Sequence, residues 1–203
     1  MALYVQTEHD CLTQDLMLIR RSAAGDQHAF RELVEKHHGN IYNLCLSITA
    51  STQDAEDLTQ ETFLKAHARL SDFRPGKKFS SWLYSIALNK CRNLLRRRKI
   101  VRFVSFGFVR GEDVRGREID PPDTGPSIEA ILERREMETL ISKLVRKLPE
   151  QLKEVFMLHH VRRIPEREIA DILGISLNNV RVRICRAKEY LWKEFSGTIG
   201  SGV

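Results

Sequence analysis

The sequence predicts an all-α protein: two small helical domains joined by a flexible linker, the second containing a helix-turn-helix. Three observations lead to this fold. Apolar residues recur at intervals of three and four along most of the 203 residues. No segment shows the alternation of a β-strand. The helical periodicity fails between residues 102 and 127, where glycines and prolines gather. We therefore expect a first domain over residues 13–101, a linker over 102–127 and a second domain over 128–197.

The first two helices are marked by the residues at their ends. A short amphipathic helix follows Thr13 and stops at Gly25. Asp26 is then expected to cap a longer helix, because its carboxylate can accept hydrogen bonds from free backbone N–H groups. That helix has an apolar stripe of Phe30, Leu33, Val34, Ile41, Leu44, Cys45 and Ile48. The adjacent His37 and His38 point about 100° apart on a helix and make a poor metal chelate, so we expect them on the helix surface.

Two more helices are expected in the first domain, over about residues 54–70 and 80–99. A loop with Pro75 and Gly76 separates them. Their apolar stripes are Ala55, Leu58, Phe63, Ala66 and Leu70 in the first, and Trp82, Leu83, Ile86, Ala87 and Leu94 in the second.

Helical periodicity returns over residues 128–148, with an inward stripe of Ile131, Leu132, Leu140, Ile141 and Leu144. Pro149 is typical of the first turn of a helix, here expected to reach residue 161. Two final helices are expected over residues 165–173 and 177–195. They share an apolar stripe of Ile169, Leu173, Leu177, Val180, Ile184, Ala187 and Leu191.

The last two helices are arranged as a helix-turn-helix. Gly174 can form the turn, because glycine adopts a positive φ at little cost, and Ser176 is a good N-cap. With Val180 facing inward, a helical wheel gives an outer face and flanks of Asn178, Asn179, Arg181, Val182, Arg183, Cys185, Arg186, Lys188 and Glu189. Such a face fits a DNA major groove, where small apolar groups contact thymine methyls and Arg reads guanine. The alternative is that Val182 and Cys185 are stray surface residues.

Residues 73–111 contain eleven Lys or Arg and no Asp or Glu, in a chain with 27 acidic residues and a net charge of +6. A basic surface favours a polyanionic partner such as nucleic acid. Aromatic residues lie among these cations, and unstacked bases can rest on ring faces while cations neutralise the backbone. We interpret Phe73 as the base platform and Trp82 as a core residue. Further contacts to an unpaired strand are expected from Arg74, Asn89 and Arg96.

An acidic face precedes this stretch. On the predicted third helix it consists of Asp57, Gln60, Glu61 and Leu64. It has the character of a docking surface for another protein. Alternatively, the acidic residues near the helix N-terminus only stabilise the helix dipole.

Several classes of protein are excluded by absence of their signals. No apolar run is long enough to span a membrane, and no secretion signal begins the chain. The four cysteines are far apart and read as reduced thiols of a cytoplasmic protein: Cys11, Cys45, Cys91 and Cys185. We find no nucleophile–base pair, phosphate-binding loop or metal cluster, so we expect neither an enzyme nor a cofactor.

Together, these motifs resemble the bacterial sigma-70 family, in its extracytoplasmic-function class. "GDQHAF", "DAEDLTQETFLKAH" and the segment from Phe73 to Asn89 are similar to the second conserved region of that family. "LPEQLKEVF", "EIADILGIS" and "NNVRVRICRAKEYL" are similar to the fourth. The resemblance extends from about Leu16 to Phe195.

The resemblance implies a protein that binds core RNA polymerase, recognises −35 and −10 promoter elements and helps to melt DNA. By position, Asp57–Leu70 corresponds to the segment that grips the clamp helices of the largest subunit, and the polymerase flap is a further implied partner. The positions that hold the −10 strand correspond to Lys65, Phe73 and Asn89. Those that face the −35 element correspond to Arg181, Val182, Cys185 and Arg186. The family also implies an anti-sigma factor as a partner.

Two other functions compete with this interpretation. A stand-alone helix-turn-helix transcriptional regulator would explain residues 166–185 but leave the aromatic and cationic loop without a role. A helical nucleic-acid enzyme would need a carboxylate cluster facing the DNA, and the basic stretch has none.

Overall fold

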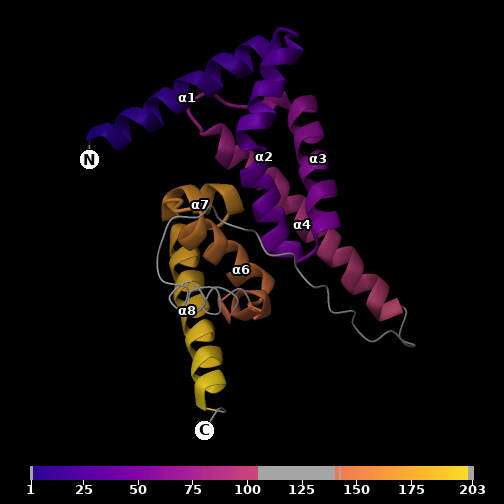
Figure 1. The fold of residues 1–203 in the computed structure, drawn as a ribbon, viewed down its shortest axis with the longest axis vertical. Coiled ribbons are helices and arrows are strands. Elements are labelled where there is room, and N and C mark those ends of the chain that lie inside the picture. The colour runs from indigo at the N-terminus through magenta and orange to yellow at the C-terminus, as the bar shows by residue number, and fades with distance from the viewer. Residues whose placement is uncertain (1, 105–139, 142, 201–203) are drawn as a thin grey trace, which may run out of the picture. The chain divides into compact units, whose positions relative to one another are not determined.

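The computed structural model describes residues 2–104, 140–141 and 143–200 (Figure 1). Within those ranges every regular element is a helix, and the chain divides into two compact units, residues 1–112 and 113–203. The predicted all-α fold with two helical domains is therefore confirmed. Residues 102–104 of the predicted linker are the end of a helix, and the rest of the linker lies outside the described residues.

In the first unit, four helices pack around one apolar core (Figure 1). They are α1 (Ala2–Ala23), α2 (Gln27–Thr49), α3 (Thr52–Ala68) and α4 (Phe79–Val104), with the 3-10 turn η1 (Leu70–Asp72) after α3. Helix α2 packs against the other three helices. As predicted, it buries Leu33, Ile41, Leu44, Cys45 and Ile48, whereas Phe30 and Val34 are half-buried. The predicted stripe of α3 is buried throughout.

Polar side chains determine where α2 and α3 begin. The Asp26 carboxylate accepts hydrogen bonds from the backbone N–H groups two and three residues further on, at 2.9 and 3.2 Å. This confirms the predicted cap. The Ser51 hydroxyl accepts a hydrogen bond from the backbone N–H of Asp54 at 3.3 Å, so α3 begins at Thr52, slightly before the predicted start.

Two helices are longer than predicted. Helix α1 begins at Ala2 rather than after Thr13, and α4 continues to Val104 rather than ending near Lys99. Neither extension contains a proline or a glycine. In the absence of a breaking residue, the helical hydrogen-bond pattern simply continues.

The second unit contains α6 (Glu150–Phe156), the π-helical turn η2 (Met157–Val161), α7 (Glu166–Leu173) and α8 (Leu177–Gly200). Residues 140–141 and 143–147 are also helical. Helix α8 packs against both α6 and α7. Pro149 is the N-cap of α6 rather than part of its first turn, because its ψ of 141° is extended. Trp192, near the end of α8, is 71% exposed.

The core of the second unit follows the predicted stripe, with one error. Buried side chains there include Leu144, Ile169, Leu173, Val180, Ile184 and Ala187. Leu177 and Leu191 are half-buried. Ile141 was expected to face inward but is 49% exposed, because the buried stripe of its helix begins one turn later, at Leu144. Ile131 and Leu132 lie outside the described residues.

We expected His37 on the helix surface, but it is buried on the side of α2 that contacts Asp15 of α1. Its Nε2 lies 3.0 Å from Oδ2 of Asp15, and Nζ of Lys36 lies 2.6 Å from Oδ1 of the same carboxylate. Burial alone would raise the pKa of Asp15, but the hydrogen bonds from His37 and Lys36 outweigh it and hold this pKa below its ordinary value. A histidine can be buried here because α1 supplies an acidic partner.

We predict that Asp15→Asn lowers the free energy of unfolding by about 1–3 kcal/mol near neutral pH, because it removes the charge from a buried hydrogen-bonded group. The wild-type advantage is fully present above the ordinary carboxyl pKa of 3.8 and is lost as pH falls through the lower folded-state pKa. Urea unfolding followed by helical circular dichroism at several pH values measures this difference.

The matched control is Asp72→Asn, in an ion pair with Arg69 whose side chains are both 62% exposed. It should change the free energy of unfolding by less than about 1 kcal/mol. Equal effects of the two substitutions would contradict a special role for the buried pair.

Candidate nucleic-acid and partner interfaces

The acidic face predicted on the third helix is present on α3. Asp57, Gln60, Glu61 and Leu64 are all exposed, and Leu64 is 63% exposed. Their spacing of three, four and seven residues places them on one side of the helix. The opposite side carries the buried apolar stripe, so this face is turned to solvent.

Ion pairs join the acidic residues of α3 to the basic residues of α4. Glu61 pairs with Lys90, and Asp54 pairs with Arg98, with 2.7 Å between its Oδ2 and Nη1 of the arginine. Asp54 also lies in the first turn of α3, where a negative charge favours the helix dipole. Part of the positive charge of α4 is therefore neutralised within the unit, although Arg96 and its neighbours remain exposed.

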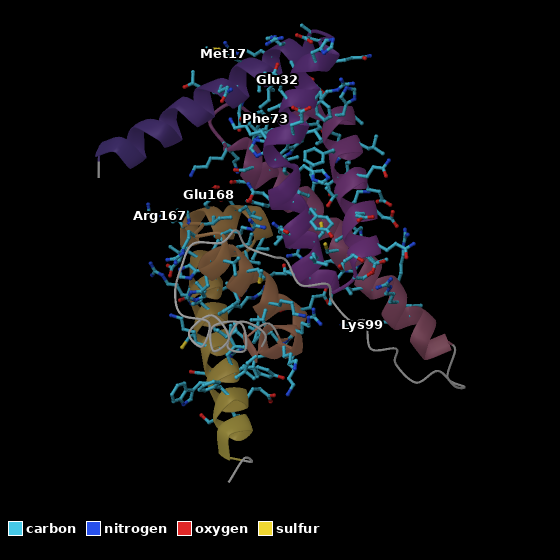
Figure 2. All side chains as sticks on the ribbon, in the orientation of Figure 1. Met17, Glu32, Phe73, Lys99, Arg167 and Glu168 are labelled. Carbon is cyan, nitrogen blue, oxygen red and sulfur yellow. The ribbon has the colours of Figure 1, made fainter. Side chains whose placement is uncertain are left out.

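Aromatic residues of the basic stretch form a cluster, in which Phe73 is more deeply buried than Trp82. Phe73 is only 8% exposed, with its ring edge-on to Phe79 and Trp82 at centroid distances of 5.6 Å each. The Phe73 ring is therefore covered in this structure, and its interpretation as the base platform stays a prediction. Trp82, expected in the core, is half-buried. Phe73 lies in the loop before α4 (Figure 2). Packing of its ring against Phe79 and Trp82 removes apolar area from water, which favours the buried position.

The other residues predicted to hold an unpaired strand are exposed on three elements. Lys65 lies on α3, Arg74 in the loop, and Asn89 and Arg96 lie seven residues apart on one side of α4. The Asn89 amide oxygen accepts a hydrogen bond from Nη1 of Arg92 at 3.2 Å. All four side chains are accessible to solvent.

A cavity of about 310 Å³ lies beside the aromatic cluster, between α1 and the loop before α4. Its lining includes Asp15 and Leu16 from α1 and Phe73, Lys77 and Phe79 from the loop and the start of α4. The volume is at the lower end of the range for ligand pockets. His37 also packs edge-on against Phe79, with ring centroids 5.5 Å apart. The buried Asp15–His37 pair therefore lies next to the start of α4.

In the second unit, α8 presents the predicted outer face. Asn178, Val182, Cys185 and Glu189 are exposed, and Val182 keeps 39% exposure although it is apolar. Val180 is fully buried on the opposite side. The Cys185 thiol donates a weak hydrogen bond to Oε1 of Glu189 at 3.5 Å. The face combines apolar and hydrogen-bonding groups, as contact with base edges requires.

The turn before α8 holds this face in place. Gly174 has a φ of 66° and ends α7 in the left-handed region, which costs a glycine little. The Ser176 hydroxyl then accepts a hydrogen bond from the backbone N–H of Asn179 at 3.2 Å, which confirms the predicted N-cap.

Two of the three arginines on this helix are held by acceptors within the unit. Arg181 donates from Nε to Oε2 of Glu166 at 2.9 Å, and Arg183 donates from Nε to Oδ1 of Asn179 at 3.0 Å. Arg186 is exposed. Glu166 was not singled out in the sequence, because it lies fifteen residues from its partner and only the fold of the helix-turn-helix brings the two together.

Two further kinds of site are absent from the part of the chain that the structure describes. There, no three or more His, Cys, Asp or Glu side chains gather closely enough to hold a metal ion. No helix in the same ranges has the length and apolar character needed to cross a membrane.

Known proteins resemble the chain over both units. Residues 33–100 match the family described as Sigma-70 region 2, and residues 138–191 match Sigma-70, region 4. The RNA polymerase sigma-H factor of Pseudomonas aeruginosa is 31% identical over 89% of this chain and 93% of its own length. The ECF RNA polymerase sigma factor SigW of Bacillus subtilis is 29% identical over 87% of this chain and 94% of its own length.

A solved structure is similar to most of the chain. It is that of CnrH in complex with the cytosolic domain of CnrY, with a TM-score of 0.63 and 28% sequence identity. The match covers 94% of this chain and 99% of that one.

We predict that Ser176→Ala lowers the free energy of unfolding by about 0.5–2 kcal/mol, because the first turn of α8 loses its side-chain cap. Chemical unfolding of the full chain, followed by circular dichroism, measures the loss. Ser196→Ala, an exposed serine near the other end of α8, is the control. If both variants are as stable as the wild type, the cap has no energetic role.

Proposed function

Because the chain belongs to the sigma-70 family, in its extracytoplasmic-function class, we propose that it binds core RNA polymerase and directs initiation at promoters with −35 and −10 elements. The observation that carries this proposal is the presence of two separate surfaces, one in each of the two regions that match the family. One is the exposed outer face of α8, and the other is the set of exposed cations that the first unit carries on α3, on α4 and in the loop before α4.

The outer face of α8 is proposed to read the −35 element in the major groove. Its contacts are Ser176, Asn178, Asn179, Arg181, Val182, Arg183, Cys185 and Arg186, all of which are exposed except the half-buried Arg183. Arg181 and Arg186 would pair bidentately with guanine, and Val182 would pack against a thymine methyl.

The exposed cationic and polar residues of the first unit are proposed to hold the unpaired −10 strand. Lys65, Arg74 and Arg96 would neutralise phosphates, and the Asn89 amide would hydrogen-bond an extruded base. The Phe73 ring packs against Phe79 next to Arg74, so its proposed use as a base platform would require the ring to leave this contact.

The exposed face of α3 is proposed to dock on the clamp helices of the largest polymerase subunit. Asp57, Gln60 and Glu61 supply acidic and polar contacts around the apolar Leu64, a combination typical of interface rims and centres. The second unit would contact the polymerase flap. Held by the enzyme at the spacing of the two elements, two weak DNA readers reach a high effective concentration without tight binding by either.

The proposed function needs no covalent chemistry by this chain, since melting is driven by capture of unpaired bases. We further propose regulation by an anti-sigma factor, because the similar CnrH was solved in complex with the cytosolic domain of CnrY. The place of action would be the cytoplasm, where the polymerase lies.

We expect core RNA polymerase, supplied with this chain, to start RNA synthesis at defined promoters from a genomic library. With 2-aminopurine in the −10 element of such a promoter, fluorescence should rise only when both proteins are present, because unstacking of the base accompanies melting. A stand-alone regulator would bind the duplex and leave fluorescence unchanged. Failure to initiate at any promoter would contradict the proposal.

We expect Asp57→Arg to weaken binding to core RNA polymerase at least about tenfold, or by about 1.4 kcal/mol. The change reverses the charge at the N-terminal end of the proposed acidic docking face. Fluorescence titration of labelled chain with core enzyme measures the dissociation constant. The control is Glu32→Arg, which reverses the charge of an exposed residue on α2 (Figure 2). Equal affinity of both variants and the wild type would contradict the assignment of this face of α3 as the polymerase-docking surface.

A further inference from the structure

The most constrained arginine on the outer face of α8 is Arg181. Its Nε lies 2.9 Å from Oε2 of Glu166, the first residue of α7. The Arg181 side chain remains 62% exposed, whereas that of Glu166 is 34% exposed. The carboxylate therefore holds the arginine from the neighbouring helix, while much of the Arg181 side chain stays in solvent.

The atoms used by this contact decide what the arginine can still do. A guanidinium has five N–H donors in a rigid plane. The Nε–H is directed to Glu166, which leaves the edge formed by the two terminal nitrogens. That edge matches O6 and N7 of guanine, the commonest specific arginine contact in the major groove. The contact thus fixes the side chain in a direction without occupying its base-reading edge.

The position of Glu166 is electrostatically unfavourable for DNA binding. A carboxylate close to the phosphates repels them and cancels the charge of one arginine, which lowers the affinity common to all sequences. The helix dipole offers another explanation, because Glu166 lies in the first turn of α7. Glu168 lies in the same turn (Figure 2), so the dipole alone does not require a carboxylate that touches the DNA-reading helix.

The other two arginines give an internal comparison. Arg183 is held through Nε by Asn179, a neutral side chain of the same helix. Arg186 is exposed, and among the residues that the structure describes it has no such acceptor. Only for Arg181, within the described part of α8, is the acceptor both charged and supplied by another helix. The direction of Arg181 is therefore tied to the angle between the two helices.

From this geometry we propose that Glu166 is a positioning residue that exchanges general DNA affinity for selectivity at one base pair of the −35 element. It orients the Arg181 fork toward a guanine and prevents the same cation from pairing with phosphates. This inference rests on the proposed function, in which Arg181 faces the −35 element. The Glu166 carboxylate would thus raise the discrimination between bases at one position and lower the affinity for DNA of any sequence. The two effects can be measured separately.

The test uses holoenzyme assembled from core RNA polymerase and the full chain. Binding is measured for a promoter and for all single-base changes in its −35 element, at several salt concentrations, and for a duplex without a promoter. Arg181→Ala first identifies the base pair that Arg181 reads, as the position where discrimination falls by about fivefold or more. The variants Glu166→Ala and Glu166→Gln are then compared at that position.

We expect Glu166→Ala to lose discrimination at the Arg181 position by about fivefold or more. Its binding to the duplex without a promoter should become tighter and more sensitive to salt, by about one additional phosphate contact. Glu166→Gln keeps an oxygen that accepts from Nε but loses the charge, so it should largely retain the discrimination while gaining general affinity. In the Glu166→Ala, Arg181→Ala double variant, the first substitution should cause no further loss at that position.

Glu168→Gln removes the same charge from the same turn and controls for the helix dipole; it should leave discrimination at the Arg181 position unchanged. If Arg181→Ala alters one position and Glu166→Ala leaves it intact, the positioning role is wrong while the proposed function stands. If Arg181→Ala alters no position, the −35 assignment of Arg181 fails, and the inference about Glu166 fails with it. Circular dichroism of each variant confirms that the helices are retained.

Discussion

The burial of one side of each helix is the constraint on which both proposed surfaces depend. In α8, Val180, Ile184 and Ala187 are buried against the other helices of the second unit. Because side chains follow each other at 100° around a helix, this packing forces Val182 and Cys185 to the outside. The same rule applies to α3, where the buried stripe leaves the acidic face exposed. The apolar core therefore selects which residues meet DNA or polymerase.

Ion pairs add a second constraint, and they affect the directions of side chains more than the free energy of unfolding. The pairs Glu61–Lys90, Asp54–Arg98 and Glu166–Arg181 each join two helices at the protein surface. Largely exposed pairs such as Glu166–Arg181 contribute little to the free energy of unfolding, whereas the Asp54 side chain is only 13% exposed. The three pairs do direct long side chains and reduce the positive field of the surfaces where they lie. In a basic protein, carboxylates in such places restrain binding that depends on charge alone.

Much of the fold could be predicted from the sequence, because helix caps and apolar stripes are local signals. Asp26, Ser176 and the stripe through Val180 were each found in this way. The errors concern residues whose environment is made by another element. The burial of His37 depends on a carboxylate from α1, and that of Phe73 depends on how a loop closes over the core. The contact between Glu166 and Arg181 was missed for the same reason, since no spacing rule connects two helices across a turn.

The two tryptophans of the chain fall in different units and different surroundings. Trp82 packs against the rings of Phe73 and Phe79, so opening of the first unit carries its indole from an apolar cluster into water. Trp192 is already 71% exposed, so its emission changes little when the second unit unfolds. Intrinsic fluorescence of the unmodified chain thus reports unfolding of the first unit almost alone. The unfolding midpoint from tryptophan emission can therefore be compared with the midpoint for loss of all helices.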